Sequence, residues 1–141
     1  KSVVFISLSD KMLFSSGSTQ LSPRAKEVLS KVATVVNDKP EMEILVEGHT
    51  DNVPIKRDCF KDNWDLSASR AVTITRILQE DYNVAPSRIT AGARSEYVPL
   101  ATNDTPEGRS TNRRIRIVIL PKLDQFYNMI ESGLKQAEEL K

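Results

Sequence analysis

The chain has 141 residues, of which 39% are hydrophobic and 28% are charged, and its 20 basic and 19 acidic residues leave a net charge of +1. These values are typical of a single folded domain, and they exclude a disordered chain and a strongly basic nucleic-acid binder. The mean hydropathy of -0.36 and the lack of a long apolar run predict no membrane span. One cysteine and one histidine exclude an intramolecular disulfide and a metal site built from clustered Cys or His.

The first half of the chain alternates between the hydrophobic periods of strands and helices. The first residues lack an initiator Met and a signal-peptide pattern, which indicates a mature piece or an excised domain. Ser22-Pro23 is a strong helix start, because a hydroxyl side chain precedes a proline at the first helical position. The elements predicted in this half are a strand at 3–8, a helix at 22–37, a strand at 42–46, a polar loop at 49–63 and a helix at 65–81.

The second half continues with two strands and a last helix. Its predicted elements are a strand at 88–93, a loop-like segment at 94–112, a strand at 114–120 and a helix after Pro121. The last helix has an apolar stripe formed by Leu123, Phe126, Tyr127, Ile130, Leu134 and Ala137. The order β-α-β-α-β-β-α predicts an α/β (α+β) two-layer sandwich. Two crossovers and a closing hairpin would give a mixed sheet with helices on one face.

Arg70 is the residue that fits a purely structural helix least well. On a helical wheel it falls inside the apolar stripe, between Leu66 and Ile74. Two interpretations stay open. The aliphatic stem covers the edge of the core while the guanidinium reaches water, or a semi-buried guanidinium faces a pocket and binds a carboxylate through paired hydrogen bonds.

Asp51 lies just past the end of the second strand, where ligands of α/β sheets tend to bind. The following helix can return its first residues to this point, so Asp51 and Arg70 are candidates for one binding pocket. Alternatively, Asp51 is a turn or cap residue, or it forms a salt bridge with Arg70. Asn63 is either the cap of the helix or a polar contact at the pocket mouth, and Thr50 is either a pocket residue or a strand-end hydroxyl.

No pattern of catalytic or cofactor-binding residues accompanies these side chains. His49 and Asp51 would supply two metal ligands, fewer than the three protein ligands of a catalytic zinc site. There is no Gly-x-Ser-x-Gly elbow and no phosphate-binding loop. Arg114 and Arg116 share one face of the last strand, which is either solvated or a weak nucleic-acid patch without interleaved aromatic residues. We therefore predict a binding pocket, with no catalytic residue, metal or cofactor.

Three separated motifs carry a resemblance to a known family. They are Glu47-Gly48-His49-Thr50-Asp51-Asn52-Val53-Pro54, Asn63-Trp64-Asp65-Leu66-Ser67-Ala68-Ser69-Arg70-Ala71 and Glu107-Gly108-Arg109-Ser110-Thr111-Asn112-Arg113-Arg114-Ile115. In this order, over about residues 3–120, the chain resembles the OmpA-like peptidoglycan-binding domain. The resemblance implies a βαβαββ fold. It divides the chain into that domain at 1–120 and a C-terminal helical extension at 121–141.

The function that the resemblance implies is non-covalent binding of peptidoglycan through the meso-diaminopimelate residue of its peptide stem. Such a module is not an enzyme. It would lie in the periplasm of a Gram-negative envelope and attach a membrane-anchored outer-membrane protein or lipoprotein to the wall. The alternative is the periplasmic domain of a MotB-like flagellar stator protein. The resemblance implies no nucleic-acid partner and leaves a homodimer open; a hydrolase of wall peptides and a nucleic-acid binder are the rival functions.

The resemblance also assigns roles to individual residues. Asp51 would bind the ammonium group of diaminopimelate, and Arg70 would bind its carboxylate. The residues that would line the pocket are Thr50, Asn63, Leu66 and Arg113, with Phe14 and Ser15 from the first loop. Ser15 stands where the family has an acidic residue, and the loop at 55–62, which carries Cys59, is longer than in many members.

Overall fold

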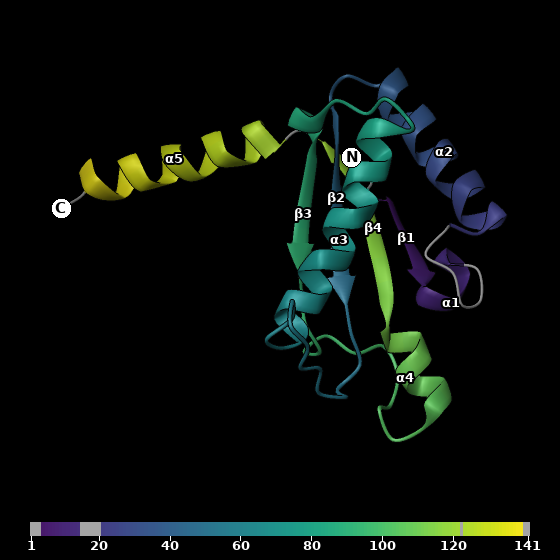
Figure 1. Ribbon diagram of the computed structural model, residues 1–141. Coiled ribbons are helices and arrows are strands. Elements are labelled where there is room, and N and C mark those ends of the chain that lie inside the picture. Colours follow the sequence, from purple (N-terminus) through teal and green to yellow (C-terminus); the bar gives the residue numbers. More distant parts are fainter. Residues whose placement is uncertain (1–3, 15–20, 122, 140–141) are drawn as a thin grey trace.

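A computed structural model describes residues 4–14, 21–121 and 123–139 of the chain (Figure 1). Its strands are β1 (Val4–Ser9), β2 (Met42–His49), β3 (Ile89–Ala93) and β4 (Arg114–Pro121). Its helices are α1 (Asp10–Leu13), α2 (Pro23–Asp38), α3 (Asn63–Glu80), the 3-10 turn η1 (Pro86–Arg88), α4 (Pro106–Asn112) and α5 (Leu123–Glu139). Every strand and long helix predicted from the sequence is present.

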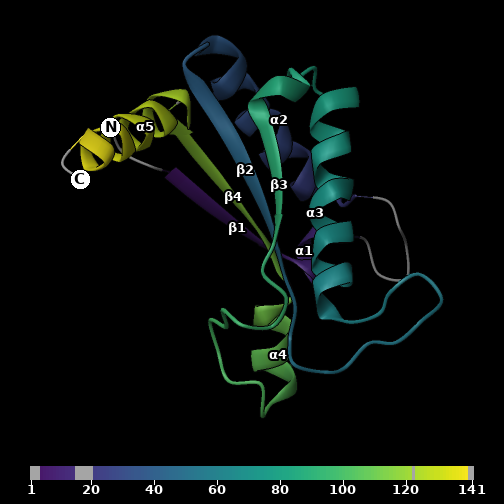
Figure 2. The same ribbon diagram turned by 90° about the vertical axis from the view of Figure 1, so that its left-hand side faces the viewer.

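The four strands form one mixed sheet in the order β1-β4-β2-β3. β2 and β3 are parallel, whereas β4 is antiparallel to both β1 and β2. Helices α2 and α3 lie on one face of this sheet (Figures 1 and 2), so the predicted two-layer α+β architecture is confirmed. The predicted closing hairpin is wrong, because β4 is inserted between β1 and β2 and does not pair with β3. A strand with buried residues on both faces, as β4 has, belongs in the interior of a sheet.

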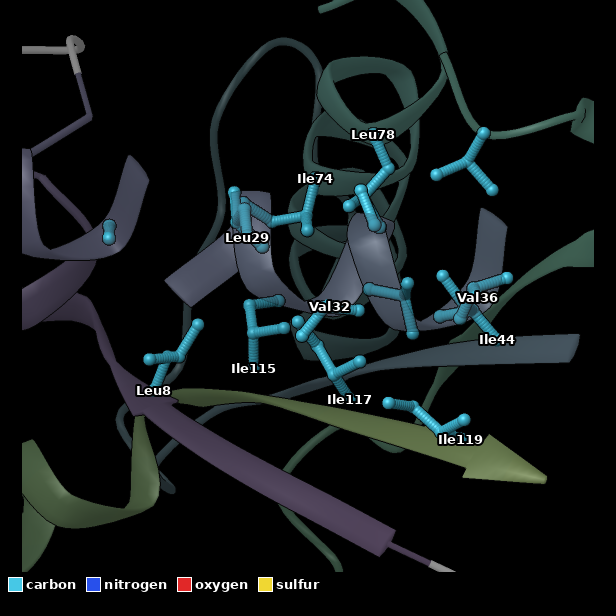
Figure 3. Packing of buried hydrophobic residues seen from close by; sticks show 14 of the residues in the cluster. Leu8, Leu29, Val32, Val36, Ile44, Ile74, Leu78, Ile115, Ile117 and Ile119 are labelled. Atoms are coloured by element: carbon cyan, nitrogen blue, oxygen red, sulfur yellow. The ribbon is translucent and has the colours of Figure 1, made fainter. Parts of the chain in front are cut away.

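The core lies between the sheet and the two long helices (Figure 3). Alternate residues of the strands face the helices, as the period of two requires. The buried aliphatic side chains include Leu8, Leu29, Val32, Val36, Ile44, Val46, Ile74, Leu78, Ile115, Ile117 and Ile119. Each such side chain contributes on the order of 1.5–3 kcal/mol through burial.

Side chains cap the helices at their first turns. The Ser22 hydroxyl accepts a hydrogen bond from the Ala25 N–H at 3.1 Å, with Pro23 in the first helical turn, as the sequence predicts. At α3, the cap is Asp62, whose carboxylate accepts from two backbone N–H groups of the first turn. The interpretation of Asn63 as the cap is therefore wrong, since Asn63 is already helical and buried.

The segment at 94–112, expected to be loop-like, contains the short helix α4. Thr105 caps it by accepting from the Gly108 N–H at 3.0 Å, and Pro106 occupies its first turn. At its end, the buried Asn112 side chain accepts from the N–H groups of Leu100 and Ala101 at 2.8 and 2.9 Å. α4 and its preceding loop are thereby fixed at the end of the sheet that β2 reaches (Figure 2).

Helix α5 extends away from the sheet after β4 ends (Figure 1). Met129, Ile130 and Leu134 on this helix are exposed. None of the helices in the described part of the chain combines the length and the apolar character needed to cross a membrane.

Candidate functional site

A cavity of about 370 Å³ lies where β2 ends and α3 begins. Six of the residues predicted for the binding site line it, namely Thr50, Asp51, Asn63, Leu66, Arg70 and Arg113. They come from the loop after β2, from α3 and from the junction of α4 with β4. The fold thus gathers at one cavity residues that are separated by more than sixty positions in the sequence.

Asp51 is 6% exposed, and hydrogen bonds fix both of its carboxylate oxygens. Its Oδ1 accepts from the Val53 N–H at 3.1 Å, and its Oδ2 lies 2.5 Å from the Arg113 guanidinium. The first bond is the local turn that the sequence allows, so Asp51 is both a turn residue and a wall of the cavity. A carboxylate held in this way presents its charge in a defined direction.

Arg70 lies at the margin of the buried face of α3. That face is centred on Ser67, Ala71, Ile74 and Leu78, so Arg70 lies beside the apolar stripe and not within it. Its side chain is 30% exposed and forms an ion pair with Asp10 of α1. The interpretation of Arg70 as a semi-buried guanidinium facing a pocket fits this position, and the suggested Asp51–Arg70 salt bridge is wrong.

Two ion pairs adjoin the cavity, and three of their four charged residues, Asp51, Arg70 and Arg113, line it. Arg70 pairs with Asp10, and Arg113 pairs with Asp51. The Asp10 N–H donates to the Arg113 carbonyl at 3.0 Å, which joins the two ion pairs through the backbone. Each charge already has an internal partner, so a ligand with both an ammonium and a carboxylate group would exchange or share these partners.

A close contact between β2 and α3 sets the position of the cavity. Gly48 lies directly against the Ser67 backbone, where a Cβ atom would overlap the carbonyl group. The Ser67 hydroxyl accepts from the Ser95 N–H at 3.0 Å and donates to the Trp64 carbonyl at 3.0 Å. Small residues at this crossing let the first two turns of α3 approach the strand ends.

Two further polar side chains hold the loop after β2. Asn63 Nδ2 donates to the carbonyl oxygens of Asp51 and Val53, at 3.2 and 3.1 Å. Thr50 donates its N–H to the Ser95 carbonyl at 2.9 Å and its hydroxyl to the Asp51 carbonyl at 2.8 Å. Of the two interpretations of Asn63, the polar contact at the pocket mouth is therefore the one that the structure supports. Both residues shape the wall from which the Asp51 carboxylate projects.

His49 ends β2 and is 2% exposed. Its Nε2 lies 3.3 Å from Glu47 Oε1, and its Nδ1 has no partner among the described residues. Burial, and then the positive charge of Arg114, holds the pKa of His49 below its ordinary value of 6.5. His49 is therefore neutral at pH 7. No group of three or more His, Cys, Asp or Glu within the described ranges has the arrangement of a metal site.

The basic side chains of β4 are not a solvated strand face. Arg114 is buried and donates to the Val98 carbonyl at 2.9 Å, and burial lowers its pKa. Arg116 lies 3.3 Å from Glu47 and stacks over the Phe5 ring at 4.3 Å from the ring centre. These internal partners leave little of either guanidinium for a phosphate backbone.

Other residues of the site depart from the sequence prediction. Phe14 packs against the core and is not among the described residues that line the cavity. Ser15 lies outside the described residues. The lining residues that the sequence did not single out are Val53, Pro54, Ile55 and Arg57. They belong to an irregular loop without hydrophobic periodicity, so no sequence signal marked them. Asp10 was missed because only the fold brings α1 to Arg70.

Comparison with known proteins places this chain in a family. The model of the OmpA family matches residues 13–113. The chain belongs to the OmpA family. Its matched range includes the six predicted residues that line the cavity.

Relatives and solved structures show which proteins carry this OmpA-family domain. Motility protein B of Bacillus subtilis is 35% identical over 119 residues, which cover 84% of this chain and 46% of the relative. Outer membrane protein Omp38 of Acinetobacter baumannii is 32% identical over 105 residues, covering 74% of this chain and 28% of the relative. The structure of the cell wall anchor of the T6SS from Pseudomonas aeruginosa has 32% identity and a TM-score of 0.70, and the match covers 85% of this chain and 82% of that one. The chain thus spans less than half the length of Motility protein B and of Omp38.

Proposed function

We propose that this OmpA-family domain binds peptidoglycan without covalent attachment, through the diaminopimelate residue of the peptide stem. The observation that supports this most directly is that Asp51 and Arg70 line the same cavity. The free end of diaminopimelate carries an ammonium and a carboxylate group on one carbon. An Asp and an Arg facing the same cavity complement both charges and their spacing.

The internal ion pairs prepare the site for this ligand. The ligand ammonium would join Asp51, which Arg113 already orients, and the ligand carboxylate would join Arg70, which Asp10 already orients. Charge-assisted hydrogen bonds contribute about 1.5–3 kcal/mol each, and less where water reaches them, as at the partly exposed Arg70. The affinity for one stem is therefore modest, which suits attachment through many copies.

Binding, and not hydrolysis, is the chemistry that these residues support. His49 is neutral, buried beside Glu47 and not paired with a nucleophile in the described structure. A relative in structure is a cell wall anchor, which agrees with a binding role. The domain would serve in the cell envelope, outside the inner membrane, as the wall-attached part of a membrane-anchored protein.

Two kinds of parent protein would use the same cavity. Identity to Omp38 supports attachment of an outer-membrane protein or lipoprotein in a Gram-negative envelope. Identity to Motility protein B, over a larger share of the chain, supports the alternative of a flagellar stator protein. Membrane fractionation of cells that express the full-length protein separates the two, since an outer-membrane protein or lipoprotein fractionates with the outer membrane and a stator protein fractionates with the inner membrane.

The test of the ligand is a calorimetric titration with two stem tripeptides that differ only in the third residue. One carries meso-diaminopimelate, and the other carries lysine, which keeps the ammonium but lacks the carboxylate that Arg70 would bind. We expect the lysine stem to bind about tenfold more weakly or worse. The variant Arg70→Gln should remove this preference. Equal affinity of the wild type for both stems would contradict the proposal.

A further inference from the structure

Two aromatic side chains lie exposed at the same end of the molecule as the cavity. Trp64 is 47% exposed and Tyr97 is 65% exposed, and their ring centres are 5.6 Å apart with the planes tilted by 40°. Aromatic rings bury large areas and are usually placed in cores, so an ordered pair in contact with water marks a contact surface. Neither residue belongs to the cavity lining described above.

Both aromatic residues are close sequence neighbours of residues that line the cavity or hydrogen-bond to its lining. Trp64 directly follows Asn63, which lines the cavity and donates to the loop after β2. Tyr97 lies two residues after Ser95, whose carbonyl accepts from the cavity residue Thr50. Since Ser95 also donates to Ser67 of α3, the loop that carries Tyr97 is fixed to the same helix as Trp64. The pair is therefore a fixed neighbour of the cavity wall.

The chemistry of the proposed ligand indicates what this pair would meet. This step rests on the proposed function, because it takes the stem peptide as the occupant of the cavity. The stem is covalently joined to a chain of amino sugars, and a spacer of two or three residues spans at most about 10 Å. With the charged end of the stem in the cavity, the sugar chain must cross the surface that surrounds it.

We propose that Trp64 and Tyr97 form a glycan-binding platform on which an amino sugar of the wall strand stacks. The faces of aromatic rings carry negative charge density, and the C–H groups of a sugar ring are their complement. The hydroxyl of Tyr97 and the indole N–H of Trp64 add hydrogen-bonding groups at the rim. The cavity would bind the stem peptide, and the platform would add contact with the glycan strand to which that peptide is attached.

Trp64 is the only tryptophan of the chain, so its fluorescence reports on the platform directly. The probe is peptide-free glycan strands, released from sacculi by an amidase that removes the stems. We expect a saturable change in Trp64 fluorescence with these strands, and about tenfold weaker binding by the variant Tyr97→Ala. Unchanged fluorescence across the titration would overturn the proposal.

A second arm separates the platform from the cavity. Trp64→Ala and Tyr97→Ala should bind intact sacculi about tenfold more weakly, yet bind the free diaminopimelate stem within twofold of the wild type. Trp64→Phe, which keeps an aromatic face, should retain most of the sacculus binding. If both alanine variants bind sacculi like the wild type, the platform is refuted while the peptide site stands. If the wild type binds strands but not the stem, the proposed function fails and the platform remains.

Discussion

The contact between Gly48 and Ser67 predicts a specific link between the fold and the binding site. In the variant Gly48→Ala, the added Cβ would lie 2.8 Å from the Ser67 carbonyl carbon and closer still to its oxygen. Non-bonded heavy atoms are most stable at about 3.5–4.0 Å, so α3 would have to retreat from β2 by at least about 1 Å. The atoms that must move are backbone atoms of a helix packed against the sheet, so no side-chain rotation relieves the overlap.

The magnitude follows from overpacking and from the position of α3. Forcing extra volume into a packed interior costs about 1–3 kcal/mol, so we expect the free energy of unfolding, measured by urea titration, to fall by about 2–3 kcal/mol. A retreat of α3 also withdraws Arg70 from the ligand. Because lengthening a charge-assisted hydrogen bond by about 1 Å removes most of its contribution, affinity for the diaminopimelate stem should fall about tenfold or more.

Gly92→Ala is the matched control on the neighbouring strand. Gly92 pairs in register with Glu47, and a Cβ there would meet Leu45 Cδ1 at 3.6 Å, an ordinary contact. We expect its free energy of unfolding and its stem affinity to stay within about 0.5 kcal/mol of the wild type. If Gly48→Ala is as stable as the wild type, or if Gly92→Ala is equally destabilised, the close approach at Ser67 does not position α3.

Three more predictions concern individual polar residues. Because the pKa of His49 is lowered in the folded state, the unfolded chain takes up a proton more readily than the folded chain as the pH falls below about 6.5. The free energy of unfolding should therefore fall with pH in this range, and it should fall less steeply in His49→Gln. Equal slopes for the wild type and the variant would contradict the burial argument. Asp10→Asn removes the charge that orients the Arg70 guanidinium, so calorimetry should show stem binding weakened by about fivefold, or ~1 kcal/mol. Tighter binding would mean that Asp10 mainly competes with the ligand carboxylate for Arg70. Asn112→Ala leaves three backbone groups of Leu100 and Ala101 without their hydrogen-bond partner, so the free energy of unfolding, measured in urea, should fall by about 2–4 kcal/mol. A decrease of less than about 1 kcal/mol would refute the role of Asn112 in holding the loop before α4.

The elements that the sequence predicted are those with a clear hydrophobic period. Helices α2 and α3 bury one face each, and burial imposes the hydrophobic spacing from which they can be predicted. α4 was missed because its seven residues bury only Gly108 and Asn112, which gives no apolar stripe. A local signal was nevertheless present, since Thr105-Pro106 repeats the cap-and-proline start of Ser22-Pro23.

The order of the strands was the harder part of the prediction. Sequence neighbours often pair, which favoured a hairpin between the last two strands. The composition of β4 indicated an interior position, because Ile115, Ile117, Val118 and Ile119 make both faces of the strand apolar. The long connection through α4 lets the chain pass β2 and insert β4 beside β1.

The candidate site was accessible to sequence reasoning where a residue conflicted with its local pattern. Arg70 was conspicuous as a charge among apolar helix positions, and Asp51 followed a strand end. The ion pairs that they form carried no such mark, because Asp10 and Arg113 meet them only through tertiary contacts; Arg113 was assigned to the pocket by the resemblance alone, and Asp10 was not predicted. The roles of all these residues in binding, and the division of the chain at residues 120 and 121, stay predictions.

Co-sedimentation with purified diaminopimelate-type sacculi tests the central claim most directly. The proteins to compare are the wild type, Asp51→Asn and Arg70→Gln, each shown by thermal unfolding to be folded at the assay temperature. Asp51→Asn keeps the shape of the side chain and removes its charge, and Arg70→Gln replaces the guanidinium with a shorter, neutral amide that still donates hydrogen bonds. We predict that the wild type sediments with the sacculi and that both variants stay in the supernatant. Sedimentation of both folded variants to the same extent as the wild type would contradict a binding site built on these two charges.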